Sequence, residues 1–283
     1  MVFAATSNTV VRFGGFATGQ ISTASTDIWQ PMTGATAATA PATESDMQFT
    51  FRTSGSLKNM GLNVSSNGRS TSTTFKSRIG GADGALSASI AGSGTGNVED
   101  TTHSDSISSG NLVNWDVLTG SGAGNLIIDV FNFDFETTNG AFQSAVGSLT
   151  KTFNASTTNY ISIAGNMNNS TTESDYQTNA RITDTLSKLD VRVITNTVTA
   201  ASTLRTRKNA ANGNLSASIT GSNTGVFSDG SHSDSVVDGD QLDYQIVTGA
   251  SGTSIILTSV GLLRGAAAPS GTVVTRRFIG IGG

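Results

Sequence analysis

The sequence contains two histidines, and each begins a His-Ser-Asp tripeptide, at residues 103–105 and 232–234. A histidine, a hydroxyl and a carboxylate are the groups of a hydrolytic triad, in which a base takes the proton of a nucleophile. Neighbouring side chains of an extended chain point in opposite directions, so adjacency in the sequence does not bring these groups together. We therefore expect no catalytic triad at either tripeptide.

The same two segments offer nitrogen and oxygen ligands for a metal ion. The candidates are three residues in each segment: Asp100, His103 and Asp105, and Asp229, His232 and Asp234. Zinc prefers a compact set of nitrogen and oxygen ligands, calcium needs six to eight oxygens, and neither spacing matches an established loop. We expect no metal and no cofactor, and interpret both segments as turns in which Ser and Asp side chains bond the local backbone. A repeated metal site at His103 and His232 remains the alternative.

Thr-Glu-Ser-Asp also occurs twice, at residues 43–46 and 172–175. Two carboxylates could act as acid and base on a glycoside, with aromatic platforms beside them. Aromatic residues make up only 6% of the chain and are mostly Phe at expected strand positions. We interpret the motif as a turn that leads into a strand, or as a subunit contact.

Glycine runs and tryptophans have similar non-catalytic interpretations. Residues 92–96 and 120–124 resemble phosphate loops, but no Gly-Lys-Ser/Thr follows, so we expect hairpin connections. Trp115 alternates with Val113 and Val117, which predicts a core position. Trp29, which Tyr160 replaces later in the chain, could stack on a sugar and remains open.

The elements that carry these motifs are themselves repeated. LSASIAGSGTG begins at Leu86 and LSASITGSNTG at Leu215, a spacing of 129 with nine of eleven residues identical. The match continues without a gap over residues 43–135 and 172–264, and extends upstream once two extra residues are allowed in the first copy. A period this long exceeds that of solenoid repeats, so each copy should be a domain with its own core.

Apolar residues alternate within each copy, as they do in β-strands with one buried face. Leu189, Val191 and Val193 form one such run, with Met60, Leu62 and Val64 as their counterparts. A change of parity between Val130 and Phe131 predicts a bulge or a strand buried on both faces. About eight short strands per copy favour two tandem jelly-roll-like β-sandwich domains, with an immunoglobulin-like sandwich as the rival.

Composition excludes several classes of function. The net charge is −4, and the 16 Lys and Arg residues are scattered, so we expect no nucleic-acid binding. Cysteine is absent, which excludes disulfides, thiolate zinc sites and cysteine nucleophiles. No apolar run is long enough to span a membrane, and the N-terminus does not read as a cleaved secretion signal. We expect a non-enzymatic protein.

The order of motifs resembles a known β-sandwich module. In the second copy these motifs occupy residues 160–165, 172–175, 184–193, 207–209, 215–219, 224–229 and 239–244. They include Thr-Glu-Ser-Asp, Arg-Lys-Asn, Leu-Ser-Ala-Ser-Ile and Gly-Asp-x-Leu-x-Tyr, and they resemble a module of bacteriophage virion proteins. The first copy departs from it at Arg78-Ile79-Gly80 and at Gly110-Asn111. The resemblance covers nearly both copies and implies a jelly-roll-like capsid decoration or fibre component, often trimeric.

We therefore predict a virion structural protein, a capsid decoration or cement protein at the virion surface. Its partners would be the major capsid protein or other virion proteins, and further copies of itself, with a trimer favoured. The alternative is a receptor-binding or glycan-binding fibre module that recognises a host surface glycan. The predicted domains are residues 1–138 with an N-terminal arm, residues 139–266, and a C-terminal arm at 267–283 that could add a strand to a neighbour. The arm residues expected to mediate assembly are Val273, Val274, Arg276, Arg277, Phe278 and Ile279.

Overall fold

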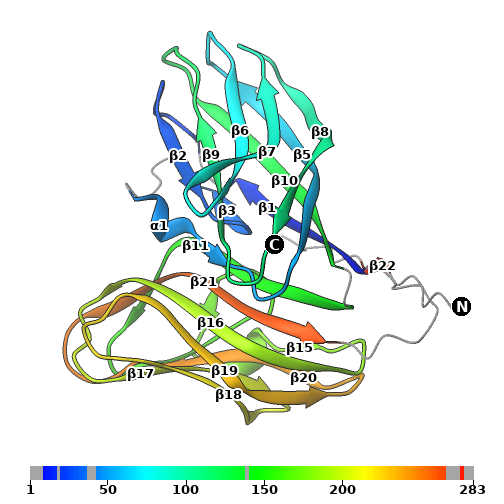
Figure 1. The fold of residues 1–283 in the computed structure, drawn as a ribbon. Helices are drawn as coiled ribbons and strands as arrows, with labels where there is room; N and C mark the ends of the chain where they lie inside the picture. Colours follow the sequence, from blue (N-terminus) through cyan, green and yellow to red (C-terminus); the bar gives the residue numbers. More distant parts are fainter. Residues whose placement is uncertain (1–8, 18–19, 37–42, 138–139, 266–274, 277–283) are drawn as a thin grey trace, which may run out of the picture. The chain divides into compact units, whose positions relative to one another are not determined.

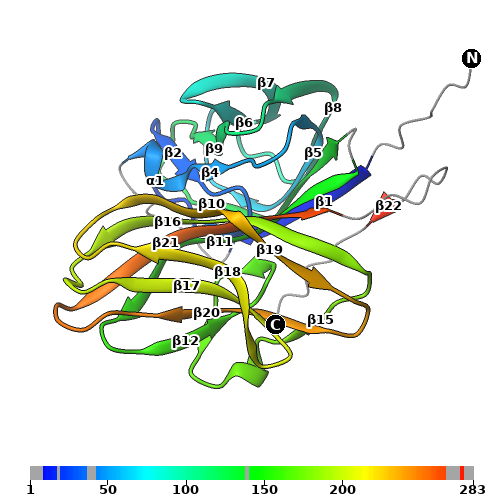
Figure 2. The same cartoon turned by 60° about the horizontal axis from the view of Figure 1, so that its bottom comes forward.

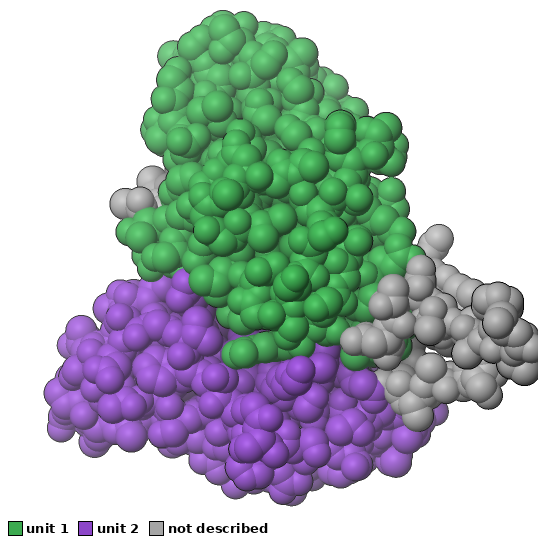
Figure 3. Space-filling view, in the orientation of Figure 1, with its two compact units in different colours: residues 1–142, 268–283 green, residues 143–267 purple. Residues whose placement is uncertain are grey.

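The chain folds into two compact units. The computed structural model describes residues 9–17, 20–36, 43–137, 140–265 and 275–276. One unit comprises residues 1–142 with 268–283, and the other comprises residues 143–267 (Figure 3). The sequence suggested a junction at 138/139 and a separate C-terminal arm, whereas the structure has the junction at 142/143 and groups residues 268–283 with the first unit.

The first unit is built from two sheets (Figure 1). The first sheet has the order β22-β1-β10-β5-β8, with the short strand β3 also paired to β1, and the second has the order β2-β9-β6-β7, with β4 also paired to β9. The strands are β1 (Thr9–Ala17), β2 (Asp27–Gln30), β3 (Gly34–Thr36), β4 (Phe49–Thr50), β5 (Gly55–Asn67), β6 (Thr73–Ile79), β7 (Ala82–Ile90), β8 (Gly96–Ile107), β9 (Leu112–Leu118), β10 (Leu126–Thr137) and β22 (Thr275–Arg276). A one-turn helix, α1 (Glu44–Met47), precedes β4.

The second unit repeats this arrangement, and its two sheets form stacked layers in Figure 2. Their orders are β13-β11-β21-β16-β19 and β14-β12-β20-β17-β18, with β15 also paired to β20. The strands are β11 (Ala141–Asn154), β12 (Thr158–Ile161), β13 (Gly165–Asn166), β14 (Asn169–Ser170), β15 (Thr178–Asn179), β16 (Asp184–Asn196), β17 (Ser202–Lys208), β18 (Ala211–Ile219), β19 (Gly225–Val236), β20 (Gln241–Val247) and β21 (Ser254–Gly265). A 3-10 turn, η1 (Glu173–Asp175), stands where the first unit has α1. No helix in the described part of the chain is long and apolar enough to cross a membrane.

The strand order identifies the sandwich as a jelly roll. Numbered along each copy, the eight main strands form sheets of order 1-8-3-6 and 2-7-4-5 in both units. Only the fourth and fifth strands are both consecutive and hydrogen-bonded, so all the remaining connections between main strands pass from one sheet to the other. This is the double Greek key of a jelly roll, and it excludes the immunoglobulin-like alternative.

The first strand of each copy also belongs to the repeat. In β1, Gly15 pairs in parallel with Gly34, and in β11, Val146 pairs in parallel with Gly165. Both pairs differ by 131 positions, which extends the duplication upstream to the first strands. Residues 10–13, near the N-terminus where the sequence suggested an arm, therefore form part of β1 inside the sheet.

The alternating residues fill the two cores as expected. Met60, Leu62 and Val64 of β5 are buried, as are their counterparts Leu189, Val191 and Val193 of β16. The predicted bulge is confirmed: the register between β10 and β5 shifts around Ile127, Ile128 and Val130. Val130 is 46% exposed while Phe131 is buried, so a bulge, and not burial on both faces, causes the change of parity.

The two cores have the same pattern but different side chains. The first is aromatic: Phe51 lies 4.6 Å from Phe135 and Trp115 lies 4.9 Å from Phe133, measured between ring centroids. Leu262 replaces Phe133 and Arg264 replaces Phe135 in the second copy, whose core is mainly Leu, Val and Ile. The hydrophobic pattern therefore determines this fold more than particular side chains do.

Candidate functional site in the duplicated polar clusters

Both His-Ser-Asp tripeptides lie in strands, at an irregularity of β8 and of β19. Between Asp100 and Ser104 the pairing of β8 with β5 skips three residues, opposite the single residue Asn59. The same irregularity separates Asp229 from Ser233 in β19. The extra residues loop out of the ladder, and each histidine is one of them.

A buried aspartate holds each looped segment. Asp229 Oδ1 accepts hydrogen bonds from the backbone N–H groups of Ser231 at 3.1 Å and His232 at 3.2 Å, and Asp229 Oδ2 accepts one from Ser216 at 2.9 Å. Burial raises the pKa of Asp229, but these N–H groups and the imidazole outweigh it and lower the pKa to about 2. Asp100 has the same arrangement, and its pKa is also lowered well below the usual range. The expected bonds to local backbone are present, but inside a strand instead of a turn.

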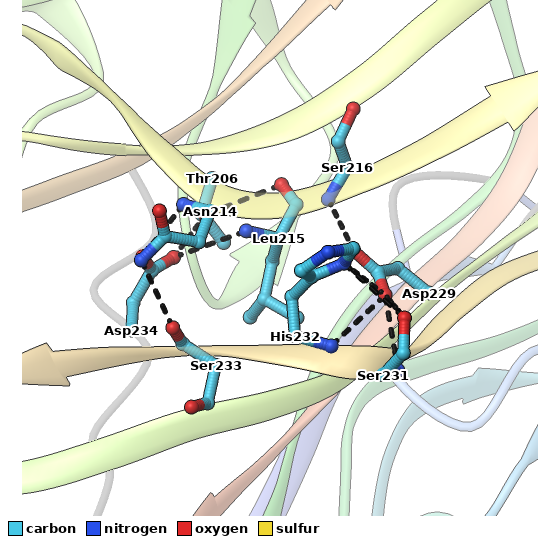
Figure 4. A network of polar contacts seen from close by, with 9 residues as sticks. All are labelled: Thr206, Asn214, Leu215, Ser216, Asp229, Ser231, His232, Ser233 and Asp234. Atoms are coloured by element: carbon cyan, nitrogen blue, oxygen red, sulfur yellow. Dashed lines mark hydrogen bonds and ion pairs between the residues drawn. The ribbon is translucent and has the colours of Figure 1, made fainter.

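The second aspartate of each motif ties the two sheets together (Figure 4). Asp234 of β19 accepts hydrogen bonds from the backbone N–H groups of Asn214 at 2.6 Å and Leu215 at 3.4 Å on β18, and from the Thr206 hydroxyl at 2.6 Å. Asp105 does the same with Ala85, Leu86 and Ser77. Strands β18 and β19 are the last strands of opposite sheets, so this carboxylate clasp closes one side of the sandwich.

The geometry of the histidines does not form a proton relay. His232 Nδ1 lies 2.9 Å from Asp229, and the Ser231 hydroxyl lies 3.2 Å from the same nitrogen while it bonds the same carboxylate. A triad needs the hydroxyl on one ring nitrogen and the carboxylate on the other. No group of three or more His, Asp or Glu residues in the described chain could hold a metal ion.

The second duplicated cluster joins Thr-Glu-Ser-Asp to an arginine that both copies share. Arg207 of β17 donates from Nε and Nη2 to the Glu173 carboxylate, at 2.8 and 3.0 Å. Arg78 of β6 makes the same two-pronged contact with Glu44, at 2.8 and 3.2 Å. Each glutamate thus fixes its short helical turn over the outer face of a sheet, which is a structural role for the candidate acid or base.

An aromatic ring completes this second cluster. The Arg78 guanidinium lies 5.2 Å from the Trp29 ring centroid, and the Arg207 guanidinium lies 5.9 Å from that of Tyr160. Trp29 and Tyr160 are half-buried, whereas Trp115 is fully buried in the core as predicted. The large hydrophobic residues that are exposed in the described chain are Leu118, Val130, Val226 and Val237, none of them aromatic.

The glycine runs connect strands of different sheets and are not hairpin loops. Residues 92–96 lead from β7 to β8, and residues 120–124 lead from β9 to β10. Backbone of the neighbouring loop lies so close to Gly92 and Gly120 that a side chain there would meet Ser70 or Thr71. Close backbone approach, and not phosphate binding, explains these glycines.

Most of the predicted assembly arm lies outside the described residues. This applies to Val273, Val274, Arg277, Phe278 and Ile279. The backbone of Arg276, with Thr275, forms β22, which pairs in parallel with Val10 and Val11 of the same chain.

The sequence did not predict the positions of two buried arginines. Arg69 donates to the carbonyl oxygens of Ile21, Thr23 and Gly122, which joins three loops, and its counterpart in the second copy is Val198. Arg264 pairs with Asp184 at 2.7 Å where the first copy has Phe135 and Gly55. Both positions could have been found by aligning the two copies, because a charged residue in one copy stands opposite an apolar residue in the other. An Arg at a Phe position inside a core requires a partner.

Comparison with known proteins identifies no family. No family model and no curated protein matches the sequence. Similar solved structures include a Paenibacillus xanthan lyase (13% identity, TM-score 0.25), covering 76% of this chain and 22% of the lyase chain. They also include the STIV MCP (11% identity, TM-score 0.26, covering 92% of this chain and 97% of that one) and the Bacillus thuringiensis delta-endotoxin Cry8Ea1 (8% identity, TM-score 0.24, covering 88% and 60%). At such low TM-scores these likenesses carry no functional argument, and the chain is described by its own structure as a duplicated all-β sandwich.

Proposed function

We propose that the protein is a virion structural protein, a capsid decoration or cement protein that binds and stabilises the shell. One observation carries this proposal. The polar residues that the two copies share, including both His-Ser-Asp tripeptides and both Glu–Arg pairs, hold strands and turns to one another. Duplication has therefore preserved a rigid scaffold, which suits a protein that acts through its surface.

The duplication itself supports adhesion. Two similar units on one chain can occupy two equivalent positions of a repetitive lattice, and the second contact then forms at high effective concentration. Interfaces of this kind are depleted in charge at their centres, and only 13% of this chain is charged. The partners proposed are the major capsid protein or other virion proteins, with further copies of this chain around a symmetry axis, in a trimer.

Residues 267–283 remain the proposed assembly arm. The parallel pairing of Thr275 and Arg276 with β1 supports this, because it brings a segment of the tail to the side of a sheet strand. In an assembled shell the tail of one copy would pair in this way with a neighbouring copy or with the shell protein.

The proposal is tested by locating the chain on particles and by binding to shells stripped of it. Full-length protein is expected to co-sediment with stripped shells and raise their melting temperature, and cryo-electron microscopy should place it on the capsid. Deletion of residues 267–283 should reduce binding at least ten-fold. Absence of the protein from particles would contradict this function. If the protein fails to bind shells and binds specific glycans on an array, the alternative of a glycan-binding fibre module replaces it.

A further inference from the structure

Asp243 is a buried carboxylate without a hydrogen-bond partner. It is 0% exposed, and both of its side-chain oxygens lack a donor. Its neighbours in β20, Leu242 and Tyr244, belong to the core of the second unit, so Asp243 points to the opposite face of the sheet. Something must therefore cover that face and keep water from the carboxylate.

The covering element is the segment from β14 to β15, residues 169–179. Strands β12 and β15 lie on one side of β20, and β17 lies on the other. Glu173 of η1 nevertheless reaches Arg207 of β17, which is the register partner of Asp243. The Glu173–Arg207 pair thus spans β20 directly above Asp243 and holds the covering segment down.

In this closed arrangement none of the groups around Asp243 donates a hydrogen bond to its carboxylate. The charged groups that act on Asp243 are Glu173 of η1, a like charge, and its register partner Arg207 of β17. Arg205 of β17 and Tyr160 of β12 both pair with Gln245, two residues along β20, and β15 consists of the uncharged Thr178 and Asn179. Arg207 is already committed to Glu173, Asn212 and the Ala210 carbonyl. An ionised Asp243 would compete with Glu173 for the same guanidinium.

The first unit provides a natural comparison. Its Glu44–Arg78 pair has the same geometry, but Asn114 stands at the position of Asp243. The neutral amide of Asn114 donates to the Trp115 carbonyl at 3.3 Å. A buried carboxylate of that face, Asp116, has Lys76 as its register partner, but burial and the charge of Asp27 still raise its pKa to about 6.

We propose that Asp243 is a proton-operated latch: protonated, it lets the covering segment 169–179 close on the sheet, and loss of its proton releases that segment. Burial and the charge of Glu173 raise the pKa of Asp243 to about 7, although the charge of Arg207 acts in the opposite direction. Protonation of Asp243 therefore favours the closed segment fully below the ordinary carboxyl pKa of about 3.9, and this contribution is lost as the pH rises from there through about 7. The latch is independent of the proposed virion function, since it concerns one unit alone.

Hydrogen exchange of the covering segment in the full-length protein tests the latch. Exchange of peptides spanning residues 169–179 is compared at pH 5.5 and pH 8.5, after correction for intrinsic rates, in the wild type and in Asp243→Asn. We expect the wild-type segment to exchange at least ten-fold faster at pH 8.5, and Asp243→Asn to exchange slowly at both. Equal wild-type rates at the two pH values, or an unchanged pH dependence in Asp243→Asn, would overturn the proposal.

Two further variants separate the latch from a general loss of structure. Glu173→Gln weakens the bond that closes the segment, so fast exchange is expected at both pH values. Asn114→Asp repeats the test in the first unit, where peptides spanning residues 43–50 should show a larger change of exchange rate between the two pH values than they show in the wild type. Failure of Asn114→Asp to enlarge this change would count against the latch even if Asp243→Asn folds poorly.

Discussion

At the scale of single residues, aspartate carboxylates accept many of the hydrogen bonds that hold strands together in both units. Asp100 and Asp229 hold the looped residues of β8 and β19, while Asp105 and Asp234 bond the neighbouring edge strands. Bonds from N–H groups to an ionised carboxylate are stronger than neutral ones, and each buried N–H that they satisfy would otherwise be costly. The histidines, by contrast, are about 60% exposed at their side chains and depend on these aspartates for their position.

The low pKa of Asp229 gives the second unit an acid-dependent contribution to stability. Because this pKa is lowered to about 2 from an unfolded value near 3.9, the contribution is present above about pH 4 and lost as the pH falls through about 2. We expect Asp229→Asn to lower the free energy of unfolding by about 1–2 kcal/mol at pH 7 and by much less at pH 2. Urea unfolding at the two pH values measures this, with exposed Asp238→Asn as the control; an equal effect at both would contradict it.

At the scale of elements, the carboxylate clasp explains why a glycine recurs at the same position in the fifth strand of each copy, as Gly84 and Gly213. A Cβ on Gly213 would fall on Thr206 Oγ1 and Asp234 Oδ2, and one on Gly84 would fall on Ser77 and Asp105. Strand β18 can approach β19 through this clasp only where its residue has no side chain. The bonded N–H groups of the edge strands are also withheld from pairing with another chain.

Gly213→Ala is therefore expected to destabilise the second unit by about 2–3 kcal/mol, because the added methyl group displaces the Asp234 carboxylate from buried N–H groups. Thermal unfolding followed by circular dichroism measures the loss. Gly230→Ala is the matched control, since its Cβ would meet nothing within 4 Å, and Thr101 stands at that position in the first copy. Equal melting temperatures for the two variants would show that the clasp does not depend on Gly213.

The contact between the third and eighth strands is made by different residues in the two copies. In β21 and β16, Arg264 and Asp184 form a buried ion pair, whereas β10 and β5 place Phe135 against Gly55. We expect Arg264→Phe alone to lower the free energy of unfolding by about 3–5 kcal/mol, because Asp184 loses its buried ion pair with Arg264. The double variant Asp184→Gly, Arg264→Phe reproduces the first-unit contact and should recover at least half of that loss. A double-mutant cycle from urea unfolding gives the coupling, and additive effects would refute the interpretation.

At the scale of the whole molecule, each unit has a core of its own, aromatic in one and mainly aliphatic in the other. Both tryptophans, Trp29 and Trp115, lie in the first unit, so tryptophan fluorescence reports on that unit alone. We expect Gly213→Ala to lower the midpoint temperature of an unfolding transition followed by circular dichroism. The midpoint followed by tryptophan fluorescence should move by less than about 1 °C. A common shift of both signals would mean that the two units unfold as one.

The sequence by itself determined the class of fold and its duplication. Strict alternation at positions such as Leu86, Ala88 and Ile90 identifies strands with one buried face, because side chains of a strand point alternately to its two sides. The identical phrase 129 residues later identifies a repeated domain, and the missing geometry of His-Ser-Asp argued against a triad. These conclusions rest on local rules, which need no knowledge of what lies across the core.

Only the tertiary structure decided which distant groups meet. The partners of Asp234 lie on strands of the opposite sheet, Glu173 meets an arginine 34 residues away, and Arg69 bonds carbonyl groups of two other loops. The glycine runs read as hairpins in the sequence because a short polar loop looks the same whether its strands pair or separate into two sheets. The order of strands in the sheets decides which kind of loop each glycine run forms. It also decides that Asp243 is buried beneath the Glu173–Arg207 pair. Both depend on pairing between distant segments, which is a property of the folded chain and not of any local segment.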